Sequence, residues 1–102
     1  MYLIQVFLPL YSNSGKRFSQ KQFSAVRETL LRRFGGVTTY SRAPASGSWK
    51  AKAQRTQSDD LLIFEVMVTK LSPSWWRRYR LELEKTFLQE RLLIRASNVL
   101  LL

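Results

Sequence analysis

The sequence predicts an α+β domain whose elements follow the order βαββαβ, and three observations support this prediction. Residues 61–69 are mostly apolar and rich in β-branched and aromatic side chains, which is typical of a central strand buried on both faces. Two segments, one after Ser19 and one after Ser72, carry helix-start signals followed by apolar residues at helical spacing. Shorter segments with strand character complete the order at 2–11, 37–43 and 91–97.

The first expected strand covers residues 2–11. Its even-numbered positions are all apolar, whereas Gln5 interrupts the odd-numbered ones. Because successive side chains of a strand point to opposite faces, the even positions are expected to meet the helices. Pro9 marks the end of the strand or a bulge, since proline cannot donate a backbone hydrogen bond to a neighbouring strand.

The first expected helix begins after Ser19, which fits the N-cap position, and Gln22 three residues later completes a capping box. Phe18 and Phe23 flank this start as a hydrophobic staple does. The pair Gly35-Gly36 supplies a left-handed stop at the other end. The apolar stripe of the helix consists of Phe23, Val26, Leu30 and Phe34, and its basic residues, Lys21, Arg27, Arg32 and Arg33, lie mostly off that stripe.

The middle of the chain holds two expected strands and a long connection between them. Residues 37–43 are rich in Thr and Tyr and form the second strand. Residues 44–58 contain Pro, Gly and several basic side chains, and they are predicted to form a basic β-hairpin excursion. Long loops in compact domains are often functional. The central strand at 61–69 then carries a single carboxylate, Glu65, in its middle.

The second expected helix has Ser72 at its N-cap and Pro73 at its first helical position, where the missing N–H of proline does no harm. Its i,i+4 pairs, Arg78 with Glu82 and Arg80 with Glu84, are interpreted as helix-surface chemistry worth about 0.2–0.5 kcal/mol each. The face expected to be buried consists of Trp76, Tyr79, Leu83 and Phe87.

The last expected strand covers residues 91–97, with Leu92, Ile94 and Ala96 facing the core. The apolar residues 99–102 follow it. An exposed apolar tail is unusual, so packing against the domain or against a partner subunit is expected.

This element order predicts a four-stranded antiparallel sheet in the spatial order 4-1-3-2, with two helices on one face and a single domain over residues 1–102. The segment Phe-Gly-Gly-Val-Thr-Thr-Tyr at 34–40, the Gly and Trp at 47 and 49, and Ile-Phe-Glu-Val at 63–66 resemble short uncharacterised bacterial proteins of ferredoxin-like type. The resemblance implies a ferredoxin-like fold and the dimeric α/β-barrel arrangement.

The composition excludes several kinds of chemistry. The chain has no histidine and no cysteine, so neither a metal site nor another cofactor is expected, and disulfides and thiolate nucleophiles are ruled out. No apolar run approaches the roughly 18 residues of a membrane span, so a cytoplasmic protein without membrane contact is predicted. The net charge of +10 is concentrated in residues 1–58, where ten basic residues face a single acid, Glu28. Such a field attracts anions of any kind.

Three polar residues mark the sheet face that the helices leave uncovered. In the order 4-1-3-2, Arg95, Gln5 and Glu65 lie on this face of three neighbouring strands and are expected to form one row. The other positions on the face are too apolar to remain in water, so a homodimer packed sheet to sheet is predicted. The row is then a device for interface specificity or part of a cavity that binds a small anionic ligand.

Glu65 is also the weak catalytic candidate. It is expected to be the only buried acid, and a carboxylate in an apolar environment can act as a general base, with Tyr40 or Arg42 orienting the substrate. Cofactor-free barrels of the class that the chain resembles carry out isomerisations and oxygenations, so a cofactor-free isomerase or monooxygenase is an alternative expectation, although such sites commonly use histidine and this chain has none.

A third interpretation uses the basic half of the chain as a module that binds nucleic acid or another polyanion. Trp49 lies between basic residues, as in sites where aromatic rings stack on bases. An RNA-recognition motif of the same element order is not expected, because the third strand has no aromatic signature on the relevant face and the Glu65 carboxylate there would repel phosphate. The candidate residues for polyanion binding are Arg32, Arg33, Trp49, Lys50, Lys52 and Arg55.

Overall fold

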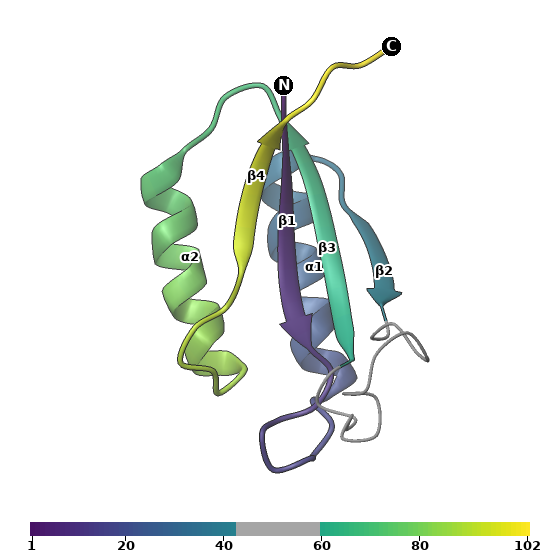
Figure 1. Ribbon diagram of the computed structural model, residues 1–102, viewed down its shortest axis with the longest axis vertical. Helices are drawn as coiled ribbons and strands as arrows, with labels where there is room; N and C mark the ends of the chain where they lie inside the picture. The colour runs from purple at the N-terminus through teal and green to yellow at the C-terminus, as the bar shows by residue number, and fades with distance from the viewer. Residues whose placement is uncertain (43–59) are drawn as a thin grey trace, which may run out of the picture.

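The computed structural model describes residues 1–42 and 60–102, and these residues form one four-stranded sheet with two helices (Figure 1). The expected basic excursion at 44–58 lies outside the described residues, and with it Trp49, Lys50, Lys52 and Arg55. The elements are β1 (Tyr2–Pro9), α1 (Gln20–Phe34), β2 (Thr38–Arg42), β3 (Leu61–Val68), α2 (Pro73–Thr86) and β4 (Ile94–Asn98).

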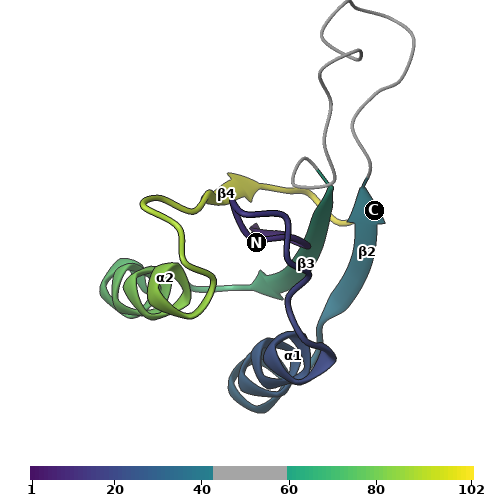
Figure 2. The ribbon, with the colours of Figure 1, turned by 90° about the horizontal axis from the view of Figure 1, so that it is seen from below.

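The sheet has the order β2-β3-β1-β4, and each neighbouring pair is antiparallel. This is the predicted order 4-1-3-2 read from the opposite edge. Both helices lie on the same side of the sheet (Figure 2). The predicted ferredoxin-like arrangement is therefore confirmed.

The helix-covered face of the sheet carries the even-numbered residues of β1, as predicted. Ile4, Val6 and Leu8 are at most 1% exposed and belong to one cluster with Phe64 and Val66 of β3. β1 ends at Pro9, which is one of the two roles predicted for this proline, although the expected strand extended to residue 11. Beyond it the chain turns back on itself in a loop.

α1 begins and ends at the predicted residues. The Ser19 hydroxyl accepts a hydrogen bond from the Gln22 backbone N–H at 3.2 Å, and the Gln22 Oε1 accepts one from the Ser19 backbone N–H at 2.8 Å. Gly35 terminates the helix with φ 82°, and its N–H donates to the Leu31 carbonyl at 2.8 Å. A side chain with a Cβ is disfavoured in this left-handed conformation.

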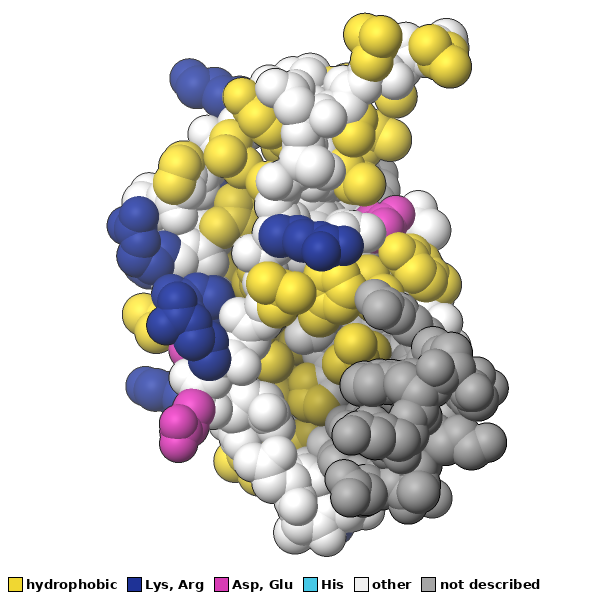
Figure 3. Space-filling model, in the orientation of Figure 1, with side chains coloured by type: hydrophobic (Ala, Val, Ile, Leu, Met, Phe, Trp, Pro, Cys, Tyr) yellow, Lys and Arg dark blue, Asp and Glu magenta, His cyan; other side chains and the backbone are white. Residues whose placement is uncertain are grey.

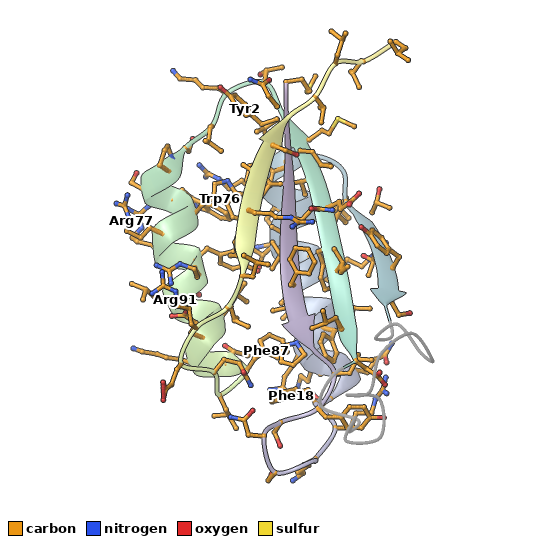
Figure 4. The ribbon with its side chains drawn as sticks, viewed as in Figure 1. Tyr2, Phe18, Trp76, Arg77, Phe87 and Arg91 are labelled. Carbon is orange, nitrogen blue, oxygen red and sulfur yellow. The ribbon has the colours of Figure 1, made fainter. Side chains whose placement is uncertain are left out.

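α2 buries the face that its periodicity predicts, with Trp76, Tyr79, Leu83 and Phe87 all below 8% exposed. The ring of Phe87 lies 5.1 Å from that of Phe18 and 5.3 Å from that of Phe23, measured between centroids. Figure 4 shows Phe18 and Phe87 close together near one end of α2. At the other end, Phe34 of α1 stacks on Trp76 at 5.2 Å. Aromatic contacts therefore join the two helices at both ends.

The predicted i,i+4 pair of Arg80 with Glu84 forms, but the expectation that it is surface chemistry is wrong for Glu84. Glu84 is 8% exposed, and its Oε2 accepts hydrogen bonds from the backbone N–H of Leu92 at 2.9 Å and from Arg80 at 3.0 Å. Leu92 precedes β4, so its buried N–H needs an acceptor other than a neighbouring strand. Glu84 is thus a buried acid, and the expectation that Glu65 alone would be buried fails as well, since Glu65 is only half-buried. Between described residues, no ion pair joins Arg78 to Glu82.

β4 differs from the prediction in its start and in one core residue. It begins at Ile94, although Leu92 before it is buried as expected. Ala96 is exposed, because β4 is an edge strand and the short methyl side chain of Ala96 does not reach the buried cluster. Of the apolar residues 99–102, Val99 is partly buried and its N–H donates to the Met1 carbonyl at 2.9 Å, whereas the three leucines that follow it are exposed. Neither of the described helices has the length and apolarity needed to span a bilayer.

Candidate functional site

The candidate site lies on the sheet face opposite the helices, which is called the open face below. Figure 3 shows this face as mostly hydrophobic surface with one basic and one acidic side chain near its middle. Exposure varies strongly across it. Phe7 and Ile63 are 6% and 2% exposed, whereas Met67 and Leu93 are 48% and 53% exposed. The open face therefore combines a buried centre with exposed apolar side chains around it.

The polar residues predicted to share a row do so. Gln5 of β1 pairs with Glu65 of β3 on one side and with Arg95 of β4 on the other. The Arg95 Nε donates to the Gln5 Oε1 at 2.8 Å, and the Gln5 Nε2 donates to the Glu65 Oε2 at 2.6 Å. Tyr40 of β2 extends the row, because its hydroxyl donates to the same carboxylate oxygen at 2.7 Å. The four side chains, called the polar row below, cross all four strands.

The two ends of the polar row carry opposite charges. Arg95 on β4 is the basic end, and its guanidinium carbon lies 5.0 Å from the centroid of the Phe7 ring, within the range of a cation–π contact. Glu65 on β3 is the acidic end. The amide of Gln5 accepts at one end and donates at the other, so it links the two charges without leaving either of its polar atoms unused. A hydrogen-bonded row of this kind can be buried at much lower cost than separate charges.

A groove of about 550 Å³ adjoins the acidic end. The groove exists because β2 pairs with β3 only as far as Glu65, so the part of β3 that continues to Val68 has no strand beside it on that edge. Its wall includes Gly35 and Gly36, which have no Cβ to fill the space. Glu65 is the charged side chain in its lining, which otherwise comprises Leu3, Phe34, Val37, Thr38, Val66 and Met67.

The chemistry available at the open face is hydrogen bonding more than proton transfer. The Glu65 Oε2 already accepts from Gln5 and Tyr40. Arg95 has further N–H donors besides the one that Gln5 accepts, and these can bind a carboxylate or phosphate above the sheet. Arg42 occupies the position in β2 opposite Leu61. Among the described residues, no group of three acidic, Cys or His side chains could hold a metal ion.

Among the titratable groups of residues 1–42 and 60–102, Tyr79 has a markedly shifted pKa, and it lies away from the open face. Burial raises its pKa to about 12, a hydrogen bond with Thr29 partly opposes that effect, and the charge of Glu82 adds to it. The phenol is therefore neutral at physiological pH. It lines a groove between α1 and α2 and is a packing residue of the helix layer.

The described polyanion candidates lie on α1, on the other side of the sheet. Arg32 approaches Glu28 at 3.9 Å, with both side chains exposed. Arg33 places its guanidinium carbon 4.6 Å from the centroid of the Trp75 ring. The stacking on Trp75 is a contact that sequence reasoning missed, although a basic residue at the end of one helix and a Trp at the start of the next are visible in the sequence.

Comparisons of the chain with protein-family models, curated proteins and solved structures give no match. The resemblance to short ferredoxin-like bacterial proteins therefore stays a prediction. The function has to be argued from the geometry of the polar row and of the surfaces around it.

Proposed function

We propose that the protein functions as a homodimeric binding protein in which two copies pack their open faces together. The observation that carries the proposal is the polar row, an internally hydrogen-bonded line of side chains with opposite charges at its ends on an otherwise apolar face. Exposed apolar surface favours association, and the hydrogen bonds within the polar row lower the cost of burying its polar groups. The remaining N–H groups of Arg95 need an acceptor from the second copy. Met67 and Leu93 supply exposed apolar area around it.

The charge order of the row favours one symmetry for the dimer. If the twofold axis runs parallel to β1 between the two sheets, the Arg95 side of one row faces the Glu65 side of the other. If the axis runs across the strands, Arg95 faces Arg95 and Glu65 faces Glu65. Like charges brought together in an interface are costly, whereas opposite charges fix the register. The parallel axis is therefore the arrangement proposed.

Other functions are less well supported by the described residues. An isomerase or oxygenase would need Glu65 as its base, but the Oε2 atom already accepts two hydrogen bonds. The groove beside Glu65 has a carboxylate in its lining and no Lys or Arg, so it favours a neutral or cationic ligand over the anionic one expected from the sequence. For a polyanion, Arg32 and Arg33 have contacts of their own with Glu28 and Trp75. A cytoplasmic location remains a prediction.

Light scattering coupled to sizing chromatography tests the dimer directly. The protein is expected to run as a dimer at micromolar concentration. Glu65→Arg and Arg95→Glu are each expected to raise the dissociation constant by about tenfold or more, because each places like charges across the interface. Circular dichroism and urea unfolding of each variant establish that it is folded.

A mixture of the two variants separates an interface role from a role within one chain. In a heterodimer of Glu65→Arg with Arg95→Glu, opposite charges face each other again. Native mass spectrometry of an equimolar mixture is therefore expected to show heterodimer well above either homodimer. A strictly monomeric protein, or a dimer that neither substitution weakens, would rule out the proposed assembly.

A further inference from the structure

A second groove, of about 310 Å³, lies on the helix side of the sheet between α1 and β2. Its volume is at the lower end of the range typical of small-molecule sites. The floor is apolar and is built from the core residues Leu10, Phe23, Leu62 and Phe64. Because the groove is on the face opposite the polar row, it is independent of the proposed dimer interface.

The walls of this groove carry polar and basic side chains. On α1, Gln20, Ser24 and Arg27 are three or four residues apart and therefore share one side of the helix. On β2, Thr39 and Ser41 pair with Phe64 and Leu62, which places the two hydroxyls on the helix side of the edge strand. Arg17 completes the lining, which contains two guanidinium groups and no acidic side chain.

The loop after β1 holds Arg17 in position. Tyr11 and Arg17 form a β-bridge, and the Arg17 guanidinium carbon lies 5.7 Å from the centroid of the Tyr11 ring. Ser12 closes the loop, since its N–H donates to the Lys16 carbonyl at 2.7 Å and its hydroxyl accepts from the Lys16 N–H at 3.2 Å. The backbone that carries Arg17 is therefore fixed before any ligand arrives.

Neither guanidinium of the groove is neutralised by a carboxylate of the described chain. The ion pairs between described residues join Arg32 to Glu28 and Arg80 to Glu84. Arg17 and Arg27 are both exposed, so their N–H groups are available to a ligand. A guanidinium presents a planar fork of donors that matches the oxygen atoms of a phosphate.

We infer that this groove binds a small phosphorylated molecule with a planar ring, of about the size of a mononucleotide. Arg17 and Arg27 hold the phosphate, and the hydroxyls of Ser24, Thr39 and Ser41 donate to its oxygens or to polar groups beside it. The ring lies on the apolar floor against Leu10 and Leu62, which are only partly buried. The anionic ligand expected from the sequence is thereby assigned to the α1–β2 groove, away from Glu65.

Isothermal titration calorimetry with adenosine 5′-monophosphate as the probe tests the inference. Adenosine and inorganic phosphate, titrated separately, are each expected to bind about tenfold or more weakly than the whole molecule, since each uses only one part of the groove. The double variant Arg17→Gln with Arg27→Gln is expected to lose binding by about tenfold or more for the same reason.

The matched control is Arg77→Gln with Arg78→Gln, which removes the same charge from exposed positions of α2. Figure 4 shows Arg77 pointing away from the sheet. This control is expected to keep its affinity within about twofold, because charges beyond a Debye length are largely screened at physiological salt. Two results would overturn the inference: no binding of the probe at millimolar concentration, or equal losses in the two double variants, which would show attraction to the net charge alone. If inorganic phosphate bound as tightly as adenosine 5′-monophosphate, the apolar floor would contribute nothing to affinity and the proposed ring contact would be wrong.

Discussion

The helix-covered face and the open face of the sheet alternate along the same strands, yet among the described residues the first is covered by two helices whereas the second keeps large apolar side chains exposed. On the helix-covered face, Val6 and Leu8 are fully buried and Phe64 is 1% exposed. On the open face, Met67 keeps 48% of its surface exposed, and a row of hydrogen-bonded polar side chains crosses the strands. The first face supplies the buried core of the described chain, and the second is the face through which we propose that two copies associate.

The largest expected effect comes from the core of the helix-covered face. Phe87→Ala removes a ring that is 0% exposed and contacts both Phe18 and Phe23. The free energy of unfolding, measured with urea, is expected to fall by about 3–5 kcal/mol. The adjacent Leu88, 67% exposed, is the control, and Leu88→Ala is expected to change that free energy by less than about 0.5 kcal/mol. Similar losses in both variants would contradict the contrast between the buried face and the surface.

An intermediate effect is expected at Glu84, the buried acid of the helix layer. Glu84→Ala leaves the Leu92 N–H without its acceptor, and an unsatisfied buried donor costs about 1–3 kcal/mol in the free energy of unfolding. Glu82→Ala removes an exposed acid from the same helix and is expected to cost less than about 0.5 kcal/mol. If urea unfolding gave the two variants the same stability, Glu84 would be the surface residue that the spacing predicts.

The smallest effect on folding, and the largest on association, is expected on the open face. Met67→Lys places a charge on the proposed interface, so the dimer dissociation constant should rise by about tenfold or more while the free energy of monomer unfolding changes by less than about 0.5 kcal/mol. Leu81 is 52% exposed on α2, and Leu81→Lys is the matched control that should leave the dimer intact. Analytical ultracentrifugation measures both. Equal dimer dissociation constants for Met67→Lys and Leu81→Lys would show that the open face is not the dimer interface.

The sequence predicts well those features that depend on neighbours along the chain or on strand alternation. The capping box of Ser19 with Gln22 and the glycine stop at Gly35 are local and appear as expected. The polar row was also predictable, because the strand order and the period of two together place Gln5 between Glu65 and Arg95.

The predictions that were wrong, and the residues that were missed, concern side chains whose neighbours come from distant parts of the chain. Spacing alone shows that Glu84 can reach Arg80, but the need of the Leu92 N–H for an acceptor arises only once the chain turns from α2 into β4. Ala96 alternates correctly, yet it is exposed because β4 lies at an edge. The hydroxyls of Thr39 and Ser41 gave no signal as site residues, since their groove exists only where α1 and β2 diverge over the core.

The central place of β1 has a consequence for the order in which the domain assembles. β1 is the first strand of the domain to be synthesised, but both of its sheet neighbours, β3 and β4, come from the second half of the chain. Such pairing between distant segments must overcome a large loop-closure entropy and is associated with slow folding. During translation, β1 therefore has neither of its native sheet partners until β3 has been made, whereas α1, which packs on one of its faces, follows it directly.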